Sequence, residues 1–164
     1  MQTRRPSKKD TPMQYFQAFL HNRCLWVAVL AWFCAQTIKI LLCLITTHRL
    51  NFSLIMGSGG MPSSHSATVC ALTTSIALTE GLDSPLFAIT AIFSFIVMYD
   101  AAGVRRAAGE QAKILNRIVR RAQEHKDEVL AERPSDLKEL IGHTPIQVFA
   151  GALLGVLLPL LFFR

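Results

Sequence analysis

The chain has 164 residues, of which 51% are hydrophobic, with a mean hydropathy of +0.35 and a formal net charge of +6. This length fits one domain, and the apolar composition excludes an ordinary soluble domain and favours a membrane protein. The charge lies outside the apolar runs without a basic and aromatic surface, so we expect anionic lipid headgroups as a partner and no nucleic acid.

The first residues predict a tail and a short helix. Residues 1–12 carry four basic side chains and two prolines, which predicts a disordered basic tail before a single membrane-embedded domain at 13–164. A signal peptide is disfavoured because the apolar run that follows is too long and lacks a small-residue cleavage site. Tyr15, Phe16, Phe19 and Leu20 then recur at helical spacing, which predicts a short interfacial helix.

The first predicted membrane span runs from Cys24 to Ile45, about the length needed to cross a bilayer. It contains Gln36 and Lys39, one turn apart on one face. Ionisable groups inside a membrane normally face a cavity or a partner, so Lys39 is a candidate functional residue. The alternative is that Lys39 snorkels toward the nearby helix end.

A glycine-rich turn precedes the second predicted span. Residues 57–66 read Gly-Ser-Gly-Gly-Met-Pro-Ser-Ser-His-Ser. Gly59 and Gly60 allow backbone conformations that are closed to other residues, and Pro62 suits the first position of a helix. We therefore expect a helix to open at about Ser63.

The start of that helix has the features of an anion site. Its first free N–H groups and the hydroxyls of Ser63, Ser64 and Ser66 would converge on a small oxyanion such as phosphate, with His65 beside them as a proton donor. The alternative is a capped helix in which the serines satisfy only the helix N-terminus and the histidine has no role.

Two further spans are predicted before the basic segment. The second, at 63–79, is rich in Ala, Ser and Thr, which favours close packing inside a bundle. The third begins at Pro85 and ends at Asp100. Asp100 is either an ordinary interfacial residue or a partner for Lys39.

Adjacent arginines, Arg105 and Arg106, follow the third span. Their planar donor groups suit phosphate oxygens, and the alternative is a positive flank that fixes the topology.

Residues 107–132 predict an amphipathic helix of about 25 residues outside the membrane, packed on the bundle or on the lipid surface. Glu110 is expected to pair with Arg106 within this helix, and 136–141 to form a short helix.

The last predicted span, 144–163, begins directly after His143. Thr144 and Gln147 form the ends of a predicted capping box, in which Gln147 reaches back to the backbone amide of the cap. Gly151 and Gly155 form a pair of small residues that would pack this helix tightly within the bundle or against a second copy in a homodimer.

The segment 62–66 resembles the Pro-Ser-Gly-His signature of the phosphatidic acid phosphatase type 2 superfamily, which also contains the vanadium haloperoxidases. The stretches 58–67, 100–111 and 142–145 resemble its small divergent bacterial membrane branch, the YuiD-like proteins, and the resemblance extends from about His21 onward. It implies an all-α, polytopic membrane bundle that hydrolyses a lipid phosphate or pyrophosphate with no metal or other cofactor.

The resemblance also implies roles for individual residues. His143 would attack phosphorus and form a phosphohistidine, and His65 would protonate the leaving oxygen. Gln147 aligns with the family's aspartate, which orients the nucleophile; an amide accepts the ring N–H but does not stabilise an imidazolium as a carboxylate does. Phosphate ligands would come from Lys39, from Arg105 or Arg106, and, at a looser match to the family's first motif, from Arg49.

Four spans would bring the glycine-rich turn, the arginine pair and His143 to one side of the membrane, around one pocket. We expect a phosphatase there; the alternative is a membrane protein that binds or moves phosphorylated lipid without hydrolysing it. A membrane serine hydrolase is weakly supported, because Ser64 and His65 are adjacent in sequence.

The predicted location is the bacterial inner (plasma) membrane, with several spans. The pocket side carries ten basic residues, nine Lys and Arg between Asp100 and His143 together with Arg49, and the other side carries six. Because positive charge near span ends favours the cytoplasmic side, this difference favours a cytoplasmic pocket.

Overall fold

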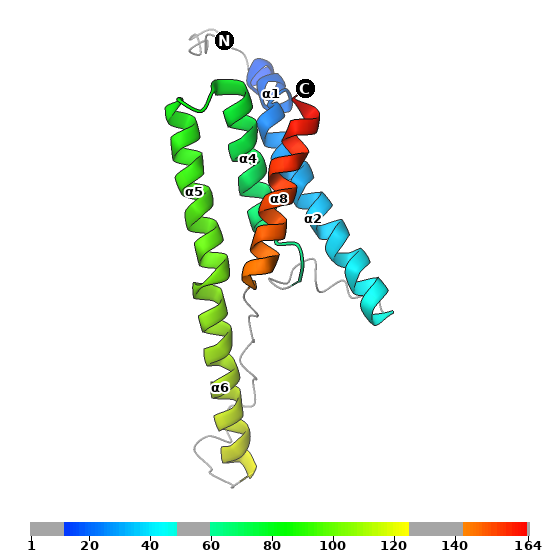
Figure 1. Ribbon diagram of the computed structural model, residues 1–164, viewed down its shortest axis with the longest axis vertical. Coiled ribbons are helices and arrows are strands. Elements are labelled where there is room, and N and C mark those ends of the chain that lie inside the picture. The colour runs from blue at the N-terminus through cyan, green and yellow to red at the C-terminus, as the bar shows by residue number, and fades with distance from the viewer. Residues whose placement is uncertain (1–11, 49–59, 125–142, 164) are drawn as a thin grey trace.

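The computed structural model describes residues 12–48, 60–124 and 143–163, which form six helices and no strand within those ranges (Figure 1). The helices are α1 (Pro12–Leu20), α2 (Arg23–Thr47), α4 (Ser64–Glu80), α5 (Pro85–Ala102), α6 (Val104–Glu124) and α8 (Pro145–Phe162). The prediction of an all-α membrane bundle is confirmed. Arg49, Gly59 and the predicted helix at 136–141 lie outside the described residues, and of Arg105 and Arg106 only the place in α6 is described.

Helix α4 is the centre of the bundle, because α2, α5 and α8 all pack against it (Figure 1). Its contact with α2 is made of alanines: Ala28, Ala31 and Ala35 of α2 cluster with Ala67 and Ala71 of α4. Side chains this small let two helix backbones approach closely, which is the usual means of packing helices inside a membrane.

Glycines make the contact between α8 and α4 closer still. A Cβ atom on Gly151 would collide with the carbonyl oxygen of Ser63, and one on Gly155 would collide with that of Ala67. The pair of small residues is therefore used within the chain, which is one of the two uses that the sequence left open. A homodimer would need a different surface.

The number of spans differs from the prediction. Three helices are long and apolar enough to cross a membrane, α2, α5 and α8, whereas four spans were predicted. The predicted span at 63–79 is α4, which has 17 residues and seven buried ones, including Ser64, Ser66 and Ser75. Because α4 faces other helices on several sides, its residues are small and polar, and its composition is not that of a lipid-facing span.

The amphipathic helix α6 continues from α5 beyond the end of the bundle and contacts α5 alone among the described helices (Figure 1). It begins at Val104, three residues before the predicted start, and it is described as far as Glu124. The Glu110 carboxylate pairs with Lys113, at 3.2 Å, within this helix. The side chain of Arg106, its predicted partner, lies outside the described residues, so that pair stays a prediction.

At the opposite end of the bundle, Arg23 of α2 contacts the C-terminal end of α8. Its guanidinium donates to the carbonyl oxygen of Phe162 at 2.7 Å and lies 4.9 Å from the ring centre of Phe163. A cation at the C-terminus of α8 is favoured by the helix dipole. The predicted helix after the tail is confirmed as α1, which already includes Pro12. All four cysteines are free thiols.

The contact between α8 and α4 predicts a strong effect of added bulk at Gly155. In Gly155→Leu the new side chain meets backbone atoms of α4, which cannot move as a flexible side chain would, so the free energy of unfolding should fall by roughly 1–3 kcal/mol or more. Thermal unfolding in detergent measures this. The matched control is Val156→Leu, which adds bulk at a neighbouring residue that is 40% exposed; equal midpoints for the two variants would contradict the prediction.

Candidate functional site

Three helix ends meet at one end of the bundle (Figure 1). The backbone N–H of Ser63, before α4, donates to the carbonyl oxygen of Gln147 in the first turn of α8, at 2.9 Å. The backbone N–H of His143, before α8, donates to the carbonyl oxygen of Ala101 near the end of α5, at 3.2 Å. These two bonds bring together the residues before α4 and before α8, as the sequence predicted.

Lys39 is buried against the glycine-rich turn. Its side chain is 3% exposed, and a Cβ atom on Gly60 would lie 2.9 Å from its Cγ. Gly60 also has a φ of +93°, a conformation that other residues rarely adopt, so both its backbone and its lack of a side chain are needed here. Lys39 therefore lies inside the bundle end and does not snorkel to an exposed position.

The structure gives Lys39 a close contact with Gly60 among the described residues. Burying a cation is costly, and an anionic ligand would lower that cost. Lys39 is thus suited to hold an anion beside the turn.

The serines before α4 serve mainly the helix itself. Ser63 is the N-cap, and its Oγ accepts hydrogen bonds from the N–H of Ser66, at 3.4 Å, and from the Ser66 hydroxyl, at 3.1 Å. Both side chains are fully buried, so the capped-helix alternative describes these two hydroxyls. Pro62 lies before the cap, and not at the first helical position as predicted. Ser64 is buried as well, at 4% exposed.

Gln147 holds both the helix cap and the histidine. Its Oε1 accepts from the backbone N–H of Thr144 at 3.1 Å, which is the predicted reach of Gln147 back to the cap amide. The same oxygen lies 3.2 Å from Nδ1 of His143. Because the Thr144 amide can only donate, it identifies the Gln147 atom as the oxygen, and that oxygen in turn requires Nδ1 to carry the proton. Nε2 of His143 then keeps its lone pair.

The second histidine faces the first from α4. The ring centres of His65 and His143 are 6.2 Å apart with an angle of 61° between the rings. His143 is 1% exposed, whereas His65 is exposed. A buried imidazole with a fixed tautomer and an exposed second imidazole are therefore side by side, close enough to contact the same small group.

The other predicted site residues are placed less closely or not at all. Asp100 is half-buried and directly precedes Ala101, whose carbonyl holds His143. Arg105 and Arg106 begin α6 just beyond that point. Glu110 is exposed on α6 in its pair with Lys113, away from the two histidines. The Ala101 carbonyl was not predicted, because a backbone contact leaves no signal in the residue types.

These features define a helical membrane protein with a lysine and two histidines gathered at one end of its bundle. Residues 20–158 match the family model described as the Divergent PAP2 family, and the chain belongs to this family. It is 53% identical over 133 residues to the uncharacterized membrane protein YuiD of Bacillus subtilis (strain 168), covering 77% of this chain and 84% of that protein. No solved structure matches the chain.

The contact of Gln147 with His143 predicts the tautomer of the ring. In Gln147→Leu the acceptor for Nδ1–H is lost, so the Nδ1–H form should no longer dominate, and α8 should lose about 1 kcal/mol of capping stability. Nitrogen NMR of histidine-labelled protein in detergent reports the tautomer directly. Gln147→Glu is the matched control, because it keeps an acceptor oxygen at the same reach; a ring unaffected by Gln147→Leu would contradict the assignment.

Proposed function

We propose that the protein is a membrane phosphatase that hydrolyses a lipid phosphate or pyrophosphate, without a metal, through His143 as nucleophile. The observation that supports this best is the hydrogen bond from Nδ1 of His143 to Gln147, which leaves the lone pair on Nε2 of a ring whose centre lies 6.2 Å from that of His65. Membership of a family related to phosphatidic acid phosphatases supports the same chemistry.

In the proposed reaction, Nε2 of His143 attacks phosphorus, the bond from phosphorus to the leaving oxygen breaks, and His65 gives a proton to that oxygen. Water then attacks the phosphohistidine, the phosphorus–nitrogen bond breaks, and His65 takes the proton from the water. Lys39 neutralises charge on the phosphate oxygens, and the N-terminal end of α4 favours a negative charge through its helix dipole. The remaining proposed phosphate ligands are Gly59, Gly60, Ser63, Ser64, Arg49 and one of Arg105 and Arg106. Asp100 is proposed as a supporting residue.

A second candidate is a protein that binds or moves phosphorylated lipid without hydrolysing it. It is favoured by Gln147, whose neutral amide already accepts from two donors and stabilises an imidazolium less than a carboxylate would. An assay of phosphate release distinguishes the two functions. The purified protein is incubated with a panel of lipid phosphates; a phosphatase releases phosphate, whereas a binder leaves the lipid unchanged.

The two histidines should differ in their effects on turnover. His143→Ala should abolish phosphate release and any phosphohistidine trapped by acid quenching. His65→Ala should slow hydrolysis of an alkyl phosphate by about 100- to 10,000-fold and spare p-nitrophenyl phosphate, whose leaving group needs no proton. Full activity of His143→Ala would exclude this nucleophile, and equal losses on both substrates in His65→Ala would exclude the acid role.

We further propose that the protein lies in the bacterial plasma membrane with its pocket facing the cytoplasm, as the excess of basic residues on that side favours. A cysteine in place of Lys126, in a variant without the four native cysteines, should resist a membrane-impermeant thiol reagent in intact cells and react after lysis. Labelling before lysis would place the pocket outside.

A further inference from the structure

Helices α5 and α8 leave an apolar groove between them, with a volume of about 360 Å³. On α5 it is lined by Phe95, Tyr99 and Ala102, and Phe95 and Tyr99 stack on each other with ring centres 6.3 Å apart. These positions recur at intervals of three and four residues and so form one face of the helix. The groove therefore follows the helix axis for about seven residues, or roughly 10 Å.

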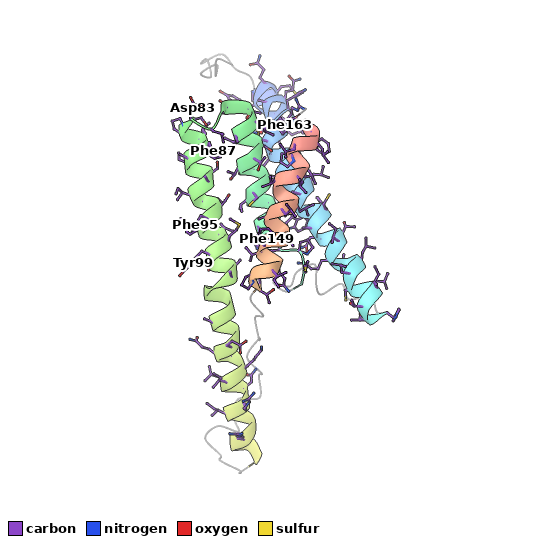
Figure 2. The ribbon with its side chains drawn as sticks, in the orientation of Figure 1. Asp83, Phe87, Phe95, Tyr99, Phe149 and Phe163 are labelled. Atoms are coloured by element: carbon purple, nitrogen blue, oxygen red, sulfur yellow. The ribbon has the colours of Figure 1, made fainter. Side chains whose placement is uncertain are left out.

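The facing wall on α8 is lined by Pro145, Phe149 and Ala152, which share one face of that helix in the same way. Figure 2 shows Phe149 on α8 at about the same height in the bundle as Phe95 and Tyr99 on α5. These aromatic side chains are largely exposed, at 65–70%, so the groove is open toward the surrounding lipid.

One end of the groove lies at the candidate site. Ala102 adjoins Ala101, whose carbonyl binds the backbone of His143, and Pro145 follows His143 by two residues. Since α5 runs toward the site and α8 runs away from it, Ala152 and Phe95 mark the far end, deeper in the span. A molecule in the groove would thus have its inner end next to His143 and its outer part in hydrocarbon.

We propose that this groove binds the hydrocarbon chain of the lipid whose phosphate lies at His143. This inference rests on the proposed function and deepens it, because it makes the substrate a phosphate ester with a long alkyl or isoprenyl chain and gives the chain a fixed place between α5 and α8. An anionic head is suited to the buried Lys39, and an apolar chain is suited to a groove lined by aromatic and aliphatic side chains.

The dimensions favour a chain over a second copy of the protein. A packed helix has a diameter of about 10–12 Å and needs contact along several turns, whereas this groove is about two turns long. A single hydrocarbon chain fits lengthwise, parallel to the helices and to the lipid chains of the bilayer.

The test is Ala152→Phe, which fills the far end of the groove and leaves His143, His65 and Lys39 in place. KM for dipalmitoyl phosphatidate should rise by about tenfold or more, since each displaced methylene weakens binding by about fourfold, while KM for dibutyryl phosphatidate should change little. Ala88→Phe is the matched control, because it adds the same bulk on an exposed part of α5 outside the groove. An equal change for both lipids, or no change for either, would overturn the inference while the phosphatase function stands.

Native mass spectrometry covers the case in which the wild-type protein releases no phosphate. The wild-type and Ala88→Phe proteins should then retain dipalmitoyl phosphatidate and Ala152→Phe should lose it, which would support the groove although hydrolysis had failed. Equal retention by all three proteins would overturn the groove. A dimer mass that disappears in Ala152→Phe would also overturn it, since a second copy would then be the occupant.

Discussion

The close approach of α8 to α4 is the contact on which the rest of the bundle end depends. Gly151 and Gly155 place the backbone of α8 directly against the carbonyl groups of Ser63 and Ala67. Only at this separation can the N–H of Ser63 reach the carbonyl oxygen of Gln147. That bond fixes the start of α8 relative to the start of α4, and so it sets His143 opposite His65. Packing between two helices thereby determines the geometry of the candidate site.

The polar content of the bundle follows from the same constraint on membrane proteins, that polar groups in hydrocarbon need partners within the protein. Ser94 of α5 donates to the carbonyl oxygen of Val69 at 3.0 Å and shares a 2.7 Å hydrogen bond with Thr73 of α4. These bonds tie α5 to the central helix. With α5 tied to α4 and α8 held by its glycines, α5 and α8 meet each other mainly near His143, and the groove between them remains.

Much of the fold could be predicted because the helix boundaries carry local signals. The helices α2, α4, α5 and α8 begin and end within two residues of the predicted bounds, and caps such as Ser84 and Thr144 mark their starts. The role of α4 was predicted less well. Its length and its serines and threonines have two explanations, a span or a buried central helix, and only the positions of its neighbours distinguish them.

The candidate site was predictable in part for the same reason. Motifs identified Lys39, His65, His143 and Gln147 as candidates, and the structure places Lys39 against Gly60 and His65 beside His143. The sequence did not separate the serine hydroxyls that cap α4 from groups available to a ligand, because both uses need the same residue type at the same position. It also gave no sign of the α5–α8 groove, which depends on how two distant segments diverge.

Gln147 shows how one neutral side chain links folding to chemistry. Its Oε1 serves the Thr144 amide and His143 Nδ1 together, so the residue that caps α8 also selects the tautomer of the ring. A carboxylate at this position would make both contacts and would stabilise an imidazolium, but its negative charge would oppose a phosphate bound a few ångströms away. The amide leaves the positive charge of Lys39 unopposed by this residue. Under the proposed function, this arrangement would favour binding of the anion, and the reactivity of His143 would depend on a neutral imidazole with its lone pair on Nε2.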